Sequence, residues 1–372
     1  MSEGGRGDLG GVAVDARAAR TMRAVWFDAF GGPLELRDVP APSCPAAGVV
    51  VRVEATGVCR SDWHGWRGHD DGIALPHVPG HELAGTVVEA GPEVRDWRVG
   101  DVVTVPFVNA CGACAACVAG EQQVCERQTQ PGFTQRGSFA ELVALDHADV
   151  NLVRLPAGMS PVTAASLGCR FATAYRALTV HGRVRAGDEV AVHGCGGVGL
   201  SAVMIAVASG ARVVAVDVSA AARSAALELG AAVALDPSGL GPEEVALLVA
   251  DATGGGAHLS LDALGHPDAA LASVLGLRRR GRHVQVGLLL AGHARTALPM
   301  DRVVGWELEV YGSHGMAAHE YPAMLAAVAS GALAPERLVG RTIGLAEAGA
   351  ALAAMGGPAT AAGMTVVEPQ RP

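Results

Sequence analysis

The sequence of 372 residues contains few aromatic residues, few charged residues and no long apolar run, and each scarcity narrows what the chain can be. Aromatic residues make up 4% and charged residues 17%, against 50% hydrophobic residues, so we expect a well-buried globular protein whose helices pack through small side chains. The net charge of −9 is spread without a basic block, which argues against a nucleic-acid partner. No run approaches the roughly 20 apolar residues of a membrane span, so no membrane partner is expected.

A secretory signal is also missing. Residues 1–20 lack an apolar signal core and are interpreted as a flexible tail. Without such a signal, the eight cysteines are expected to be reduced thiols or metal ligands and not disulfides. The chain exceeds the length of one ordinary core. We therefore expect a soluble, cytoplasmic protein of two domains.

The first part of the chain has the pattern of β-strands. Apolar or alternating runs bounded by glycine and proline occur at 22–27, 34–39, 48–57, 82–91 and 99–107. Between the third and fourth runs, residues 57–82 offer little to a core but contain Cys59 and His81, ligand types that Zn²⁺ prefers. Taken alone, this stretch is equally consistent with a loop that holds a buried thiol.

Four further cysteines lie close together in the sequence, at spacings of three, three and eight: Cys111, Cys114, Cys117 and Cys125. Such a set can surround one tetrahedral ion and close all four positions, which predicts a structural zinc. Redox-active or coincidental cysteines are the alternative. A four-iron cluster is a more specific alternative, but the usual cysteine–proline ending of its sequence motif is absent.

From about Pro161 the pattern changes. Residues 161–180 are predicted to form one or two helices that contain Cys169. Strand-like and helical segments then alternate, which predicts a parallel, doubly wound sheet; its six candidate strands are 189–194, 212–218, 231–236, 259–265, 282–287 and 307–313. The arginines at 278–280 and 282 are interpreted as a solvated loop.

The first strand-to-helix turn of this alternation carries a G-x-G-x-x-G pattern, formed by Gly194, Gly196 and Gly199. In this context the glycines allow the backbone to approach a pyrophosphate at the helix N-terminus. Asp217, at the end of the next strand, can accept hydrogen bonds from ribose hydroxyls and would repel a 2′-phosphate, which favours NAD over NADP. A structural turn beside a solvated aspartate is the alternative.

Together these motifs resemble the zinc-dependent alcohol dehydrogenases of the medium-chain dehydrogenase/reductase superfamily over residues 22–367. GHELAGTVVEAG is similar to the family's zinc signature, CGACAACVAGEQQVC to its structural-zinc lobe and GCGGVG to its coenzyme turn. The resemblance implies an α/β protein with a GroES-like β-rich catalytic domain and a Rossmann domain with a six-stranded parallel sheet. The implied bounds are 21–167 (with the lobe at 109–126), 168–313, and a return to the catalytic domain over 314–372.

The resemblance also assigns the metal ligands. Cys59, His81 and Cys169 would bind a catalytic zinc and leave a fourth position for water or substrate. Glu82 would approach this zinc transiently or, equally, support its ligands from outside, and Asp62 would orient His81. With the four-cysteine lobe, two zinc ions per chain are implied.

The implied reaction transfers hydride between an alcohol and NAD, or in reverse from NADH to an aldehyde. Cys169, where polyol-type relatives often have a carboxylate, favours primary alcohols. Ser61 would contact the reacting oxygen and His64 would pass the proton to water, although His64 also suits an ordinary surface histidine. The implied coenzyme contacts are Arg60, Thr173, Gly194, Gly196, Gly197, Val198, Gly199, Asp217, Val286 and Gly287. The implied pocket wall is Phe107, Trp63 and Trp66, although Trp63 and Trp66 equally suit a packing role.

Some residues differ from the family pattern, and some residues and properties are not assigned by the resemblance. Ala222 and Met364 stand where relatives often have basic residues, which would weaken NAD binding. The short segment between Cys125 and Cys169 is like that of bacterial members and implies a homotetramer, with a dimer as the alternative. His69 and His314 receive no role. Two alternatives remain: a dehydrogenase dedicated to a larger metabolite, and a zinc- and nucleotide-binding protein without turnover.

Overall fold

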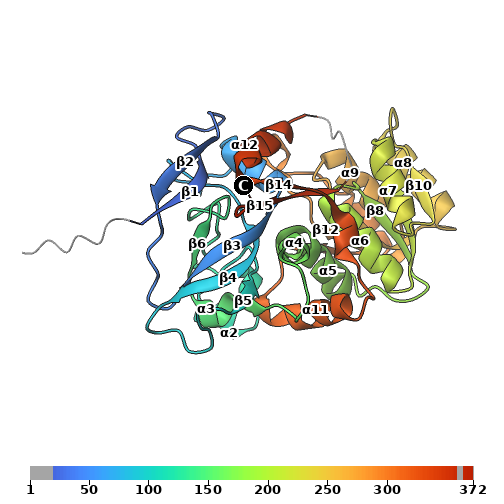
Figure 1. Ribbon diagram of the computed structural model, residues 1–372. Helices are drawn as coiled ribbons and strands as arrows, with labels where there is room; N and C mark the ends of the chain where they lie inside the picture. Colours follow the sequence, from blue (N-terminus) through green and yellow to red (C-terminus); the bar gives the residue numbers. More distant parts are fainter. Residues whose placement is uncertain (1–19, 358–362, 372) are drawn as a thin grey trace, which may run out of the picture.

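The computed structural model describes residues 20–357 and 363–371, so the first 19 residues of the predicted tail lie outside the described part of the chain. A β-rich domain and an α/β domain lie side by side, and a helical segment (α4 and α5) runs between them (Figure 1). This arrangement confirms the predicted fold class, a mixed α/β protein with a parallel six-stranded sheet. No helix within these ranges is long and apolar enough to cross a bilayer.

The β-rich domain is built on one seven-stranded sheet. Its strand order is β14-β15-β3-β4-β5-β7, with β6 paired to β3. The bounds are β3 Val49–Val58, β4 Glu82–Ala90, β5 Val102–Thr104, β6 Leu142–Leu145, β7 Val153–Arg154, β14 Val339–Gly344 and β15 Met364–Glu368, and a separate hairpin pairs β1 Thr21–Trp26 with β2 Glu35–Pro40. The short helical elements are α1 Arg60–Trp66, α2 Ala115–Val118, η1 Gln122–Val124 and α3 Ala148–Asn151.

The strand predicted over 99–107 is shorter in the structure, where β5 covers only Val102–Thr104. Asp101 accepts a hydrogen bond from the N–H of Arg98 and closes a turn before the strand. Pro106 lacks an N–H and cannot continue a strand ladder beyond it.

The C-terminal strand pairs on one side with a strand that is distant in the sequence. β15 pairs antiparallel with β3 through Thr365–Val58, Val366–Gly57 and Val367–Thr56. Helix α12, Leu345–Ala354, packs against β1. The end of the chain is therefore part of the sheet that also carries the Cys59 and His81 segments.

The α/β domain has the strand order β10-β9-β8-β11-β12-β13, with every pair parallel. All six predicted strands are present: β8 Glu189–His193, β9 Arg212–Val216, β10 Val233–Leu235, β11 Ala257–Asp262, β12 Leu277–Gln285 and β13 Glu309–Gly312. Its helices are α6 Gly197–Ala208, α7 Ala220–Glu228, α8 Pro242–Ala252, α9 Pro267–Leu275 and α10 Met300–Gly305, with the short turn η4 Ala291–His293. This order reverses at β8, and ligands of doubly wound sheets bind beside such a reversal.

The arginine cluster is a correction to the sequence interpretation. These residues lie in β12 and not in a loop between a helix and a strand. The register of β12 against β11 shifts between Leu277 and Arg282, and Arg280 has a φ of 60°. This bulge turns Arg280 towards Glu307 at 2.9 Å, while Arg282 pairs with Asp188 at 3.4 Å. The irregular strand breaks the period-two pattern on which the prediction depended.

One helical run joins the two domains. It consists of α4 Pro161–Ser166, the π-helical turn η2 Leu167–Phe171, α5 Ala172–Arg176 and a second π-helical turn, η3 Ala177–His181. Ser160 caps its start by accepting a hydrogen bond from the N–H of Thr163. The sequence predicted one or two helices here, without the π turns. The chain continues after β13 with three further helical elements: η5 Ala318–Glu320, α11 Tyr321–Ala329 and η6 Pro335–Leu338.

Candidate active site

Three segments bring four metal-ligating side chains together between the domains. Cys59 lies between β3 and α1, His81 directly precedes β4, Glu82 is the first residue of β4, and Cys169 lies on the π turn η2. The ligand atoms of these four residues all lie within 4.8 Å of one another. All are buried except Cys169, which is half-buried. The structure thus brings together the three predicted zinc ligands and Glu82.

Asp62 fixes the geometry of this group. Its carboxylate accepts hydrogen bonds from His81 Nδ1 at 2.8 Å, from the N–H of Gly80 at 2.9 Å and from the N–H of Cys59 at 3.1 Å. Because Nδ1 is engaged, the metal-binding nitrogen of His81 is Nε2, which is buried and has no hydrogen-bond partner among the described residues. A buried imidazole nitrogen facing two thiols fits Zn²⁺, and the carboxylate behind the histidine is a usual support of such a ligand.

The electrostatics of the group favour a thiolate. The neighbouring Cys169 thiol, against the opposing effect of burial, and the nearby His81 and Arg170 side chains hold the pKa of the Cys59 thiol well below its usual value. The thiolate is the form of cysteine that binds metals. The donor set and its charge therefore suit a zinc ion held by two sulfurs and one nitrogen.

Glu82 is held by a residue that the sequence did not single out. Arg170 Nε donates to Glu82 Oε1 at 2.9 Å, and Arg170 Nη2 donates to Oε2. Although burial disfavours the charged guanidinium, Glu82 and Cys59 raise the pKa of Arg170 above its usual value. The only signal in the sequence was an arginine next to Cys169 in a largely apolar helical segment, which also contains Arg176.

Tyr321 is a second residue that sequence analysis missed. Its hydroxyl donates to the carbonyl of Gly168 at 3.1 Å, and its side chain is fully buried. The contact joins α11 to the π turn one residue before Cys169. Tyr321 thus anchors the turn that presents Cys169. An apolar segment with one tyrosine gives no signal for this contact.

Ser61 and His64 lie on α1, directly after Cys59. Both are half-buried, and His64 Nδ1 lies 2.9 Å from Nδ1 of the exposed His69. Burial, His69 and Arg60 lower the pKa of His64. The ring of Trp63 lies edge-on to both histidines, with centroids 5.0 and 5.8 Å apart. The segment that follows Cys59 therefore carries the polar side chains of Ser61 and His64 and, beyond α1, the exposed His69.

The predicted pocket residues separate into two groups. Phe107 lies 6.1 Å from His81 and 5.0 Å from His314, edge-on to both rings. Trp66 instead donates to the carbonyl of Gly32 at 2.9 Å and packs against the core of the β-rich domain. A groove of about 770 Å³ lies beside His314 and is also lined by Val286, Gly287, Gln123 and Val124.

The glycine turn follows β8 and opens α6. Gly194 has a φ of +86°, which favours glycine. A Cβ on Gly199 would lie 1.8 Å from the carbonyl oxygen of Gly194, so only glycine allows the turn to close. Val198 lies in the first turn of α6, and the buried Thr173 lies on the neighbouring helix α5.

Asp217 lies against this turn. Its carboxylate accepts hydrogen bonds from the N–H of Cys195 at 2.6 Å and of Ser219 at 2.7 Å. Arg223 donates to the carbonyl oxygen of Asp217 at 2.7 Å and pairs with Asp236 at 2.9 Å. The basic side chain missing at Ala222 is thus present one residue later, with its charge balanced by Asp236.

Arg60, which was predicted to contact the coenzyme pyrophosphate, contacts other protein groups in this structure. Its guanidinium donates to the carbonyl of Met355, just after α12, and lies over the ring of Trp63 at 4.9 Å. These contacts hold Arg60 at α12 in this structure. Its predicted contact with a pyrophosphate remains a prediction.

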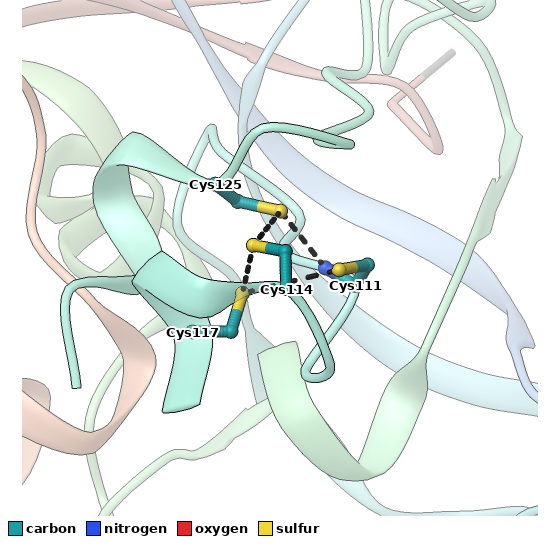
Figure 2. A group of neighbouring side chains, drawn as sticks. All are labelled: Cys111, Cys114, Cys117 and Cys125. Atoms are coloured by element: carbon teal, nitrogen blue, oxygen red, sulfur yellow. Dashed lines mark hydrogen bonds between the residues drawn. The ribbon is translucent and has the colours of Figure 1, made fainter. Parts of the chain in front are cut away.

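The four cysteines of the lobe turn their sulfur atoms towards one another (Figure 2). Their Sγ atoms are separated by 3.4 Å (Cys114–Cys117), 3.7 Å (Cys114–Cys125) and 4.0 Å (Cys111–Cys117). All are free thiols. Zn–S bonds of about 2.3 Å place sulfurs about 3.8 Å apart in a tetrahedron, so the spacing fits one zinc ion.

The pKa values of these thiols differ within the lobe. The backbone N–H of Ala113 lowers the pKa of Cys111 to about 6, whereas burial raises the pKa of Cys117 to about 12. A positive ion bound among them would favour the thiolate form of all four. With all four positions taken by protein sulfur, such an ion is structural.

Comparison with known proteins agrees with this geometry. A family model described as alcohol dehydrogenase GroES-like domain matches residues 45–157, and one described as zinc-binding dehydrogenase matches residues 197–330. An alcohol dehydrogenase of Geobacillus stearothermophilus is 35% identical over 273 residues, which is 72% of this chain and 78% of that protein.

Solved structures are similar over almost the whole chain. The alcohol dehydrogenase TADH from Thermus sp. ATN1 superimposes with a TM-score of 0.84 at 32% identity, covering 93% of this chain and 99% of that one. A structure described as an NAD-dependent alcohol dehydrogenase gives a TM-score of 0.82 at 31% identity, with coverage of 93% and 99%. With its two zinc-binding groups and its doubly wound sheet, the chain belongs to the zinc-dependent alcohol dehydrogenases of the medium-chain dehydrogenase/reductase superfamily.

Proposed function

We propose that the protein transfers hydride between an alcohol, with primary alcohols favoured, and NAD, and that it reduces an aldehyde with NADH in reverse. The observation that carries this proposal is the buried Nε2 of His81, which has no partner among the described residues and faces two thiols. The glycine turn and Asp217 lie on the neighbouring domain, where the order of the parallel sheet reverses. A metal and a dinucleotide can therefore meet between the domains.

In this proposal Cys59, His81 and Cys169 hold the catalytic zinc, which when bound supplies Lewis acidity to the alcohol oxygen. Asp62 keeps Nε2 of His81 free for the metal. Glu82 accepts a hydrogen bond from Arg170. This contact favours the role in which Glu82 supports the metal ligands from outside, and not a transient approach to the metal. Phe107 and His314 form one wall of the substrate pocket.

The proton leaves along α1. Ser61 contacts the reacting oxygen, His64 accepts the proton, and the exposed His69 lies at hydrogen-bond distance from His64. Because burial lowers the pKa of His64, the imidazole is neutral at neutral pH and can act as a base.

Replacement of His64 by asparagine should slow alcohol oxidation at neutral pH roughly 100-fold, the low end of what a positioned base contributes. The loss should shrink as pH rises, because hydroxide then removes the proton. In the wild type, oxidation should fall only below pH 6.5, because the pKa of His64 is lowered. The measurement is kcat against pH for both proteins.

His69→Asn is the matched control, because it keeps the base and removes the neighbour that lowers its pKa. The acid limb of its profile should move to higher pH, with little change in the plateau. An unchanged pH profile in His64→Asn would contradict the proposed proton route.

Asp217 supports NAD as the coenzyme because its carboxylate lies against the glycine turn, where it would repel a 2′-phosphate. Arg223, the nearest cation, is paired with Asp236. The remaining coenzyme contacts are proposed for Arg60, Thr173, Gly194, Gly196, Gly197, Val198, Gly199, Val286 and Gly287. The four cysteines of the lobe are proposed to bind the structural zinc.

We also propose a cytoplasmic homotetramer, with a dimer as the alternative. β13 is an edge strand of the α/β sheet. Val310 on this strand is 40% exposed, and Val304 on the preceding helix α10 is 74% exposed. An unpaired edge with exposed apolar side chains supports association with a second copy. The molar mass measured by light scattering would test this.

The function is tested by following NADH absorbance with a graded series of aldehydes and ketones, from short aliphatic to bulky aromatic. A clear size optimum is expected and would define the substrate class. Absence of turnover in a protein that contains two zinc ions and binds NADH would favour the alternatives, one larger metabolite or a binding role. Absence of zinc and of NADH binding would contradict the proposal.

A further inference from the structure

Arg170 is a buried arginine that neither the zinc ligands nor the glycine turn explains. It follows Cys169 on the turn η2, which packs against both β4 and α6. Its Nε and Nη2 donate to the two oxygens of Glu82, and its side chain is only 8% exposed. A guanidinium carries five donor hydrogens, so a buried one needs partners beyond a single carboxylate.

The third nitrogen of Arg170, Nη1, faces the first turn of α6. A Cβ on Gly197 would lie 2.4 Å from Arg170 Cδ and 3.3 Å from Nη1. Gly197 is the first residue of this 12-residue helix, and the first N–H groups of a helix have no partner within it. Nη1 makes no hydrogen bond in the described part of the chain. A guanidinium nitrogen without a partner thus lies beside the residue that opens α6, and positive charge near a helix N-terminus favours an anion.

The proposed function identifies this anion as the pyrophosphate of the coenzyme. The glycine turn that would receive it ends at the start of α6. Met364, which stands where relatives often have a basic residue, is uncharged and buried in the core. Arg170 reaches the same turn from another element and can supply the missing positive charge.

We propose that Arg170 binds the coenzyme pyrophosphate through Nη1 while it holds Glu82 through Nε and Nη2. This inference rests on the proposed dinucleotide-dependent function. Because one guanidinium serves both partners, the phosphates and Glu82 share its charge. The affinity for the coenzyme then depends on the charge of a side chain in the catalytic metal group, and by linkage the dependence is reciprocal.

The test compares the affinities of the zinc-loaded protein for ADP-ribose, which contains the pyrophosphate, and for adenosine, which does not, by calorimetric titration. Arg170→Met should weaken ADP-ribose binding roughly 10- to 100-fold, as expected for the loss of charge-assisted hydrogen bonds, and should leave adenosine binding unchanged. Arg170→Lys should restore part of the affinity. Glu82→Gln should tighten ADP-ribose binding, because it releases the guanidinium.

Arg170→Met leaves Glu82 buried without its partner and can fail to fold. The double variant Glu82→Gln/Arg170→Met removes both charges and is compared with Glu82→Gln alone. Affinity for ADP-ribose equal to that of Glu82→Gln would overturn the inference, as would an equal loss for adenosine. If the wild type binds neither ADP-ribose nor NADH, the proposed function itself fails, which is a separate result.

Discussion

Replacement of Cys59 by alanine is expected to abolish hydride transfer while NADH binding is retained. Cys59 and Cys169 are the two thiols of the catalytic group, and their ligand atoms and that of His81 lie within 4.8 Å of one another. Without Cys59, two protein ligands remain, which is too few for a stable catalytic zinc. The Lewis acidity of the metal is worth several kcal/mol, so turnover should fall roughly 1,000-fold or more. The zinc content should fall from two ions to one per chain.

Cys44→Ala is the matched control. Cys44 is a half-buried free thiol that lies 3.6 Å from the carbonyl oxygens of Pro45 and Gly48, outside both metal groups. This variant should keep two zinc ions and full activity. Activity retained in Cys59→Ala would contradict the zinc mechanism. Loss of both zinc ions together with NADH binding would show that the substitution unfolds the protein.

Features that depend on short stretches of sequence were predicted well. The cysteine spacing of the lobe, Cys111 to Cys125, fixes its sulfur geometry almost alone, because the four residues share one compact loop. The six strands of the α/β domain could be predicted because each is a short apolar run followed by a turn signal. The pairing of His81 with Asp62 came only from the family resemblance, since 19 residues separate them.

Features that depend on distant contacts could not be predicted. Arg170 would be expected on a surface, and its burial is stabilised by Glu82, 88 residues earlier in the chain. The π turn at Cys169 packs against β4 and α6. A π turn contains one residue more than a regular helical turn, and the local pattern of apolar residues does not show where that extra residue is inserted. The anchoring of Gly168 by Tyr321 has the same origin.

Replacement of Asp217 by glycine is expected to relax the coenzyme preference towards NADP. The carboxylate lies at the end of β9, beside the glycine turn, and its removal abolishes the repulsion of a 2′-phosphate. Arg223 lies next to this position and can then attract the phosphate, because it already contacts the carbonyl of Asp217. The ratio of kcat/KM for NADP to that for NAD should rise roughly 100-fold, or about 2.8 kcal/mol.

The hydrogen bonds of Asp217 require a second variant. Its carboxylate also accepts from the N–H groups of Cys195 and Ser219, so glycine removes an anchor of the turn as well as a charge. Asp217→Asn keeps one acceptor oxygen and removes only the charge. If charge sets the preference, both variants should shift the ratio, and asparagine should retain more of the absolute activity with either coenzyme.

Asp251→Asn, which neutralises an exposed carboxylate at the end of α8 in the same domain, should leave the ratio unchanged. That control separates the local repulsion from a general change in domain charge, because a long-range field would respond to either carboxylate. Equal selectivity in the wild type and in both Asp217 variants would mean that the ribose does not bind at Asp217. A loss of activity with both coenzymes in the glycine variant alone would instead assign Asp217 to the support of the turn.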